Sequence, residues 1–190
     1  MTLEGPEGSG KTVVARRLTA ELTARGRRAV LTREPGGTRL GERVREILLG
    51  RVDLGIDPRA DALLFNAARA QLVAEVIRPA LDAGEVVICA RFADSTLAYQ
   101  GYGAGLPVLE LRALASVATG GMDPDLTVLL DVDPELGIKR KAAGARNRFE
   151  SIDLEFHRRV RAGFLELAHQ EPERWRVVDS SRRRTTRTSA

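Results

Sequence analysis

The sequence has few features of an exported or membrane-bound protein. Its one cysteine, Cys89, rules out an intrachain disulfide and lies in an apolar run typical of a buried strand. No run of about eighteen apolar residues occurs, and the N-terminus lacks the charged-then-apolar layout of a secretory signal. We therefore expect a cytoplasmic protein without a membrane partner.

Aromatic residues are also scarce, at 4% of the chain, and form no row of platforms on which single-stranded nucleic acid could stack. The net charge is +4, from 30 Lys and Arg against 26 Asp and Glu. Part of this excess lies in the terminal Arg182, Arg183, Arg184 and Arg187, and much of the rest alternates with acids along helical stretches. We expect no nucleic-acid partner, and keep a basic nucleic-acid-binding module as an alternative.

Short apolar runs alternate with stretches of helical periodicity along the whole chain, which at 190 residues suits one compact domain. The predicted strands cover residues 1–3, 29–31, 86–89, 126–130 and 176–178. The predicted helices cover residues 14–22, 60–83, 109–117, 134–141 and 153–169. This alternation favours parallel strands with helical crossovers. We predict an α/β fold of the P-loop NTPase type, with an open parallel sheet of about five strands flanked by helices in three α/β/α layers.

A glycine-rich loop carries the strongest chemical signal. Residues 5–12 match G-x-x-x-x-G-K-[ST] between a predicted strand and a predicted helix. In such a loop the backbone N–H groups converge on phosphate oxygens, Lys11 reaches the β and γ phosphates, and Thr12 can ligate Mg²⁺. The predicted ATP-binding residues are Gly5, Pro6, Glu7, Gly8, Ser9, Gly10, Lys11 and Thr12.

Two arginines directly follow predicted strands. Arg33 comes after the second strand and Arg91 after the third. Ligands of open parallel sheets gather beyond the carboxyl ends of the strands, so both side chains would face one crevice. Either arginine alone is equally well explained as a solvated loop residue. Together they favour a second anion site, which a kinase with a phosphorylated acceptor needs.

The chain also resembles a known family, the thymidylate kinases, from Leu3 to about Ser180. Six separate segments carry the resemblance, namely residues 4–12, 33–38, 63–69, 91–101, 124–127 and 147–150. The most discriminating are Arg33-Glu34-Pro35-Gly36-Gly37-Thr38 and Ser95-Thr96-Leu97-Ala98-Tyr99-Gln100, because a P-loop alone fits many enzyme types. The resemblance implies transfer of the γ-phosphoryl group of ATP to dTMP, giving dTDP, by a homodimer.

The resemblance also implies the residues that recognise the nucleoside. Phe65 would stack on thymine, and Arg69, one helical turn later, would donate to the base carbonyl at position 4. Tyr99 would pack where a ribose 2′-hydroxyl would otherwise sit, and Ser95 and Gln100 would complete the pocket. From periodicity alone, Phe65 and Tyr99 would instead be ordinary core residues.

For the rest of the acceptor, the resemblance implies that Arg33 and Arg91 hold the monophosphate and that Glu7 accepts from the sugar 3′-hydroxyl. The attacking group is then a phosphate oxygen that is already anionic near neutral pH. No strong general base is needed, and positioning with charge neutralisation suffices.

A basic stretch at residues 139–150 resembles a lid over ATP. The P-loop itself carries no arginine, so further cations for the transition state must come from elsewhere. Arg140, Arg146 and Arg148 are the available donors, alongside Lys11 and Arg91. The alternative for this stretch is a solvated helix end.

The sequence departs from the family pattern in three places. Ala90 stands where the family has an aspartate that helps organise magnesium, so we expect weaker Mg²⁺ binding and a slow kinase. The first strand is short, and the basic segment 182–190 replaces a final helix and is expected to be disordered, leaving one domain over residues 1–181. Two further alternatives are a kinase for another nucleoside monophosphate and a nucleotide-binding protein with little turnover.

Overall fold

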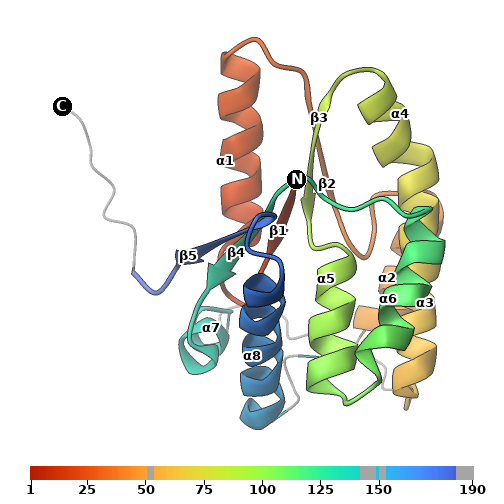
Figure 1. The fold of residues 1–190 in the computed structure, drawn as a ribbon, viewed down its shortest axis with the longest axis vertical. Helices are drawn as coiled ribbons and strands as arrows, with labels where there is room; N and C mark the ends of the chain where they lie inside the picture. Colours follow the sequence, from red (N-terminus) through yellow and green to blue (C-terminus); the bar gives the residue numbers. More distant parts are fainter. Residues whose placement is uncertain (51–53, 142–148, 150–152, 183–190) are drawn as a thin grey trace.

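The computed structural model describes residues 1–50, 54–141, 149 and 153–182 (Figure 1). Its centre is one sheet of five strands in the order β2-β3-β1-β4-β5, and every pairing is parallel. The strands are β1 (Thr2–Glu4), β2 (Ala29–Arg33), β3 (Val86–Ala90), β4 (Thr127–Asp131) and β5 (Trp175–Asp179). The prediction of an open parallel sheet is therefore confirmed.

Helices cover both faces of the sheet, as the three-layer prediction requires. They are α1 (Lys11–Ala24), α2 (Arg39–Leu49), α3 (Pro58–Leu72), η1 (Val73–Ile77), α4 (Arg78–Asp82), α5 (Ala93–Thr96), η2 (Leu97–Gly103), α6 (Val108–Thr119), α7 (Pro134–Lys141) and α8 (Leu154–Gln170). Side chains of β3 alternate between the two faces. Ile88 packs with Leu3 and Ala15 under α1, whereas Val87 and Cys89 pack with η1 and α4 on the other face. Figure 1 shows α1 on one side of the sheet and α3 and α4 on the other.

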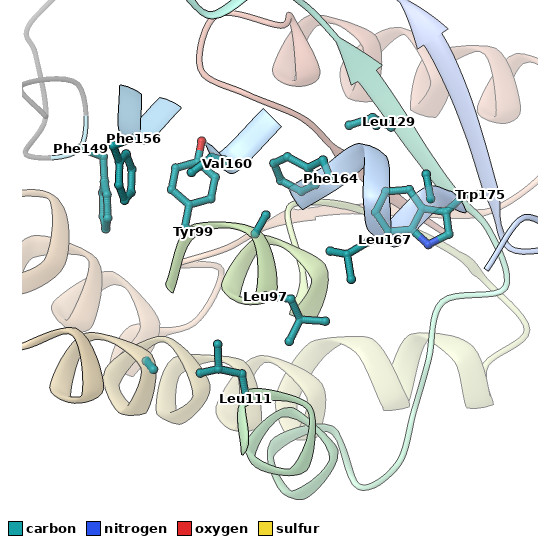
Figure 2. Close-up of a cluster of buried hydrophobic side chains, with 13 residues drawn as sticks. Leu97, Tyr99, Leu111, Leu129, Phe149, Phe156, Val160, Phe164, Leu167 and Trp175 are labelled. Carbon is teal, nitrogen blue, oxygen red and sulfur yellow. The ribbon is translucent and has the colours of Figure 1, made fainter. Parts of the chain in front are cut away.

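The largest apolar cluster lies between η2 and α8 (Figure 2). The Tyr99 ring of η2 lies 6.2 Å from each of the Phe156 and Phe164 rings of α8, and 5.7 Å from the ring of Phe149. Gly103 allows this close approach, because an added Cβ would lie 2.7 Å from Phe156 and 2.8 Å from Val160. The cluster fixes η2, and with it the wall of the cavity described below.

Two helical segments, residues 39–49 and 93–103, were not predicted from the sequence. Helix α2 begins at Thr38, whose side chain accepts from the Gly41 N–H at 2.9 Å, and it buries Val44 and Leu48. Charged residues interrupt its narrow apolar stripe, so no helix was predicted. Most residues of α5 and η2 are buried and none is fully exposed, so these helices have no solvated polar face to reveal their period.

Other local predictions are confirmed. Helix α1 ends at Ala24, and Gly26 follows with φ 73°, the left-handed conformation expected of a terminating glycine. Cys89 is buried in β3, where burial raises the pKa of its thiol well above the usual value. Among the described residues, no helix is both long enough and apolar enough to cross a membrane. The predicted tail beyond Arg182 lies outside the described residues.

Candidate active site

A cavity of about 340 Å³ opens beyond the carboxyl ends of β1, β2 and β3. Its walls come from the P-loop, the segment after β2, helices α2 and α3, the turn after β3, and the end of α7. The lining residues that concern function are Glu7, Lys11, Thr12, Arg33, Arg45, Phe65, Arg69, Ala90, Arg91, Ser95, Tyr99, Gln100, Arg140 and Lys141. Every residue predicted for the acceptor therefore shares one cavity with Lys11.

The P-loop connects β1 to α1 and has left-handed backbone at three glycines, with φ 140° at Gly5, 69° at Gly8 and 92° at Gly10. Only glycine adopts these angles without strain. The loop also packs tightly against α7, because an added Cβ at Gly8 would collide with the carbonyl group of Gly137. The loop conformation that the motif predicted is present, and α7 supports it from outside.

Lys11 folds back over this loop. Its Nζ donates to the carbonyl oxygens of Gly5 at 2.9 Å and Pro6 at 2.8 Å, and to Ser9 Oγ at 3.1 Å. Burial and the neighbouring Arg91 lower the pKa of the Lys11 ammonium to about 7, against partial compensation by nearby carboxylates. The loop thus concentrates positive charge where phosphates are expected to bind.

Arg91 follows β3 with φ 72°, the only left-handed non-glycine residue of the described chain. Its Nη1 donates to the Gly5 carbonyl at 3.2 Å and to Ser95 Oγ at 3.1 Å. Its Nη2 donates to Glu7 Oε1 at 2.7 Å and to the Tyr99 hydroxyl at 3.0 Å. Strained backbone persists where surrounding contacts over-determine it, and these contacts hold the guanidinium against the P-loop.

Glu7 bridges two cations. Its Oε1 accepts from Arg91, and its Oε2 accepts from Lys141 Nζ at 2.6 Å. Burial alone would raise the pKa of the Glu7 carboxyl, but Arg91, Lys11 and Lys141 outweigh burial and hold this pKa far below its usual value. Glu7 is therefore a carboxylate throughout the physiological range.

Glu4, to which no role was assigned from the sequence, supports the turn after β3. This fully buried carboxylate accepts from the Phe92 N–H at 2.7 Å and from Ser95 Oγ at 2.6 Å. Burial and the nearby Asp94 raise the pKa of Glu4 to about 7. In the sequence, Glu4 stands out only because it directly precedes the first P-loop glycine, Gly5. That position does not show that its carboxylate binds Phe92 and Ser95.

Arg69 lies on α3 with its side chain 1% exposed, paired with the carboxylate of Glu34. Nε donates to the two Glu34 oxygens at 3.0 and 3.3 Å, and Nη2 donates to Oε2 at 2.7 Å. Nη2 also donates to Phe92 O and Thr96 Oγ1, and Nη1 donates to Asn66 Oδ1 at 2.7 Å. Burial raises the pKa of Glu34. These contacts fix the guanidinium plane and leave only part of the Nη1 group for a ligand.

The predicted nucleoside pocket lies beside Arg69. Phe65 is partly buried one turn earlier on α3, with its ring 6.1 Å from that of Phe149. Tyr99 and Gln100 are buried and line the same wall of the cavity. The Tyr99 ring belongs to the apolar cluster while its hydroxyl donates to Glu7 at 3.3 Å, so this residue serves both the core and the cavity.

Two arginines of the β2–α2 region, Arg33 and Arg45, line the cavity and differ in their surroundings. The Arg33 side chain, 53% exposed, donates to both Glu42 oxygens at 2.9 and 3.0 Å. Arg45 is half-buried, lines the cavity and donates to the Pro35 carbonyl at 2.9 Å. Burial, followed by the charge of Arg33, lowers the pKa of Arg45. Arg45 was not predicted from the sequence because α2 was not predicted.

The predicted transition-state cations are only partly described. Arg140 lines the cavity, but its Nη1 donates to Ser180 O at 2.7 Å and its Nη2 to Ser181 O at 2.6 Å. Arg146 and Arg148 lie outside the described residues. Lys141, the neighbour of Arg140, was not singled out from the sequence and reaches Glu7 from the end of α7.

Thr12 is the only predicted metal ligand, and it lines the cavity in the first turn of α1. The described residues contain no group of three or more His, Cys, Asp or Glu side chains that could hold a metal ion. Ala90 contributes a methyl group to the cavity where a carboxylate was expected. A single hard hydroxyl fits a Mg²⁺ ion whose other ligands are phosphate oxygens and water.

Known proteins resemble the chain over nearly its whole length. The family model described as Thymidylate kinase matches residues 3–188. A thymidylate kinase from Deinococcus radiodurans is 56% identical over 183 residues, which cover 96% of this chain and 88% of the relative. One from Roseiflexus castenholzii is 50% identical, covering 95% of this chain and 85% of the relative. The crystal structure of a thymidylate kinase from Ehrlichia chaffeensis superimposes with a TM-score of 0.74 at 37% identity, covering 93% and 90% of the two chains.

Proposed function

The chain belongs to the thymidylate kinase family, and from this premise we propose how its own residues perform the reaction. The reaction is the ATP-dependent phosphorylation of dTMP to dTDP. One observation carries the proposal: Lys11 of the P-loop and Arg91 of the expected acceptor site both donate to the carbonyl oxygen of Gly5. Phosphate groups held by these two side chains would therefore be neighbours.

On the donor side, we propose that the P-loop amides bind the ATP phosphates and that Lys11 moves from the Gly5 and Pro6 carbonyls to the β and γ phosphates. The left-handed glycines support this role, because such backbone allows successive N–H groups to converge on one anion. Burial, followed by repulsion from Arg91, lowers the pKa of Lys11, and the negative charge of a bound polyanion would oppose both effects.

On the acceptor side, Arg91 and Arg45 are proposed to bind the dTMP phosphate, with Arg33 at the exposed rim of the cavity. Glu7 and Ser95 hold the Arg91 guanidinium in place, so binding the phosphate requires only that Arg91 exchange its contact with the Gly5 carbonyl for the substrate. A phosphate oxygen then attacks the γ phosphorus without a general base. Phe65 and the remaining Nη1 donor of Arg69 would contact the thymine.

The divalent metal is proposed to be Mg²⁺, held by the Thr12 hydroxyl together with ATP. Such an ion supplies positive charge that neutralises the phosphate oxygens during transfer. Ala90 adds no ligand, which supports the expectation of a high Mg²⁺ requirement.

We propose that the chain forms a homodimer through the outward face of α6, which exposes large apolar side chains. Leu109 and Val117 on this face are 82% and 83% exposed, and Leu63 on the adjacent α3 is 56% exposed. A second copy of this chain would cover these side chains. Light scattering should give twice the chain mass, and Val117→Asp should shift the measured mass towards that of the monomer.

We also propose a cytoplasmic location, because the proposed substrates, ATP and dTMP, are expected in the cytoplasm.

The decisive experiment is a coupled ADP-release assay with dTMP, dUMP, dCMP, dGMP and AMP at two magnesium concentrations. Turnover should be fastest with dTMP. Preference for another monophosphate would replace the substrate assignment.

Ala90 favours one second candidate, a nucleotide-binding protein with little turnover. Calorimetry that detects binding of ATP and dTMP without ADP release at any magnesium concentration would select that function over the kinase.

A further inference from the structure

A buried carboxylate lies beside the turn that carries the arginine of the expected acceptor site. Glu4 ends β1, is fully buried and does not line the cavity, whereas Arg91 and Ser95 do. Burying a carboxylate costs free energy, and an apolar side chain would occupy this place in β1 without that cost. The presence of Glu4 therefore calls for an explanation beyond packing.

The hydrogen bonds from Arg91 through Ser95 to Glu4 run in one direction. A guanidinium only donates, so Ser95 Oγ is the acceptor of Arg91 Nη1 at 3.1 Å. The Ser95 hydroxyl in turn donates to Glu4 Oε2 at 2.6 Å. A hydrogen bond that ends on a charged acceptor is short and strong, and it polarises the bond before it. The charge of Glu4 thereby acts on Arg91 through Ser95.

The other carboxylate oxygen keeps Glu4 in place. Oε1 accepts from the Phe92 N–H at 2.7 Å, and the neighbouring Arg91 N–H donates to the Leu3 carbonyl at 3.0 Å. Two successive amides of the turn are thus held by two successive residues of β1. Arg91 has left-handed backbone, with φ 72°, which persists where such contacts over-determine it. Glu4 Oε2 therefore stays directed at Ser95.

Asp94, a second carboxylate near Glu4, is paired with a different arginine. Arg174 Nη1 donates to Asp94 Oδ2 at 2.7 Å, and Arg174 Nη2 donates to Asp94 Oδ1 at 3.0 Å. Burial, followed by the charge of Asp94, raises the pKa of Glu4 to about 7, and the hydrogen bond from Ser95 opposes this rise. Because Arg174 compensates the charge of Asp94, Glu4 is the carboxylate that remains for the chain of Ser95 and Arg91.

Resting on the proposed kinase function, we propose that Glu4 is a positioning residue that orients Arg91, through Ser95, to bind the phosphate of dTMP. Glu4 itself does not contact the substrate. The phosphate would replace the Gly5 carbonyl as an acceptor of Arg91. The contacts of the guanidinium with Ser95 and Glu7 would remain. Without the charge of Glu4, the Ser95 hydroxyl loses its acceptor, and phosphate binding must then also order the guanidinium.

The first test measures, by calorimetry at pH 8 without ATP, how tightly Glu4→Gln binds dTMP and thymidine. Glutamine has the shape of glutamate, but it is neutral and its NH₂ group meets one of two donors, the Phe92 N–H or the Ser95 hydroxyl. Thymidine has no phosphate and therefore does not need Arg91. We expect E4Q to bind dTMP about tenfold more weakly than wild type, and thymidine less than about twofold more weakly.

Thr2→Val is the matched control. Thr2 lies on the same strand, is also buried and does not line the cavity, and its Oγ1 is 2.9 Å from Thr127 Oγ1. T2V loses a buried hydrogen bond, as E4Q does, and should lower the melting temperature without changing the ratio of dTMP to thymidine affinity. A ratio that is unchanged in E4Q, or that falls equally in T2V, overturns the proposal.

Should E4Q show no cooperative thermal unfolding, Glu4→Asp takes its place. Aspartate keeps the charge, but it is one methylene shorter and cannot reach both the Phe92 N–H and Ser95 Oγ. The ratio of dTMP to thymidine affinity should then fall at least about threefold. Equal weakening of both ligands in E4D overturns the proposal.

A second test establishes the route through Ser95. Ser95→Ala removes the hydroxyl that joins Glu4 to Arg91, so E4Q should weaken dTMP binding less than about threefold in the S95A background. A full loss of about tenfold in that background would mean that Glu4 acts independently of Ser95, and it overturns the proposal.

Failure of the proposed function is distinguishable. Wild-type protein that binds dTMP no more tightly than thymidine, and that releases no ADP with any monophosphate, refutes the acceptor site and the kinase assignment. Active wild type that prefers dTMP, together with E4Q that keeps the same preference, refutes only the role of Glu4.

Discussion

The side chains of Lys11 and Arg91 donate to the same atom, the carbonyl oxygen of Gly5, at 2.9 and 3.2 Å. Lys11 belongs to the P-loop and Arg91 to the turn after β3, and the parallel pairing of β1 with β3 brings these segments to one edge of the sheet. The two nitrogens are therefore no further apart than the sum of these two bonds. If two phosphate groups took the place of the Gly5 carbonyl as acceptors for Lys11 and Arg91, they would lie close enough for a phosphoryl group to pass between them.

Lys11→Ala should abolish turnover, because the ammonium group is the P-loop cation that reaches the β and γ phosphates. We expect kcat to fall at least about 10³-fold in the coupled assay, while thermal unfolding shows a folded protein. Near-native turnover of K11A would refute the role of Lys11.

The pKa of Lys11 predicts a pH dependence. Its pKa in the free protein is lowered to about 7, so the ammonium group loses its proton as the pH rises through that value. The kcat/KM for ATP should fall about tenfold per pH unit above pH 8, because this parameter reports the free enzyme. In the ternary complex the phosphates stabilise the ammonium group, so kcat should fall only at higher pH.

Rate profiles between pH 6 and 9 check this expectation. A guanidinium keeps its charge throughout this range, so the fall above pH 8 should be absent from the profile of Lys11→Arg, whatever its absolute rate. A wild-type kcat/KM that stays constant to pH 9 contradicts the lowered pKa.

Ala90→Asp should lower the magnesium requirement. Ala90 lines the same cavity as Thr12, and an organising carboxylate at this position is expected to raise metal affinity about 10-fold or more. Activity at limiting magnesium should rise, and the two proteins should converge at saturation. If the magnesium titrations of A90D and wild type coincide, the site does not lack this carboxylate.

Arg69→Met should destabilise the fold by about 3–5 kcal/mol, because it leaves the buried carboxylate of Glu34 without its partner. The double variant R69M/E34Q removes the uncompensated charge and should recover part of this loss. Urea unfolding of both variants and of wild type measures the difference. A double variant no more stable than R69M would mean that the unpaired Glu34 charge is not the cause.

This pair also affects how base selectivity is tested. A loss of dTMP turnover in R69M could reflect partial unfolding. The ratio of dTMP to dCMP turnover should therefore be measured in R69M/E34Q. A ratio at least tenfold below that of wild type would support the proposed contact with the thymine carbonyl.

The sequence predicted what local physics decides. Short apolar runs bounded by turn residues predict strands, and a period of 3.6 residues predicts helices with one buried face; all five strands were found from such runs. The P-loop was predictable because its backbone needs positive φ angles at Gly5, Gly8 and Gly10, which only glycine adopts without strain. The helices at residues 39–49 and 93–103 escaped, since one has a narrow apolar stripe and the other has no solvated polar face.

Only the tertiary structure decided which charged side chains face one another. Arg33, predicted for the phosphate, pairs with Glu42, while Arg45 and Lys141 reach the cavity from helix faces whose direction depends on packing. Glu4 and Glu34 acquire their raised pKa values from burial, which is not a local property. The sequence by itself determined that the strands are parallel and where the P-loop lies, because these follow from the alternation of strands with helices and from local backbone sterics. The pairing of charges required the fold, since residues far apart in the chain meet only where the parallel strands end together.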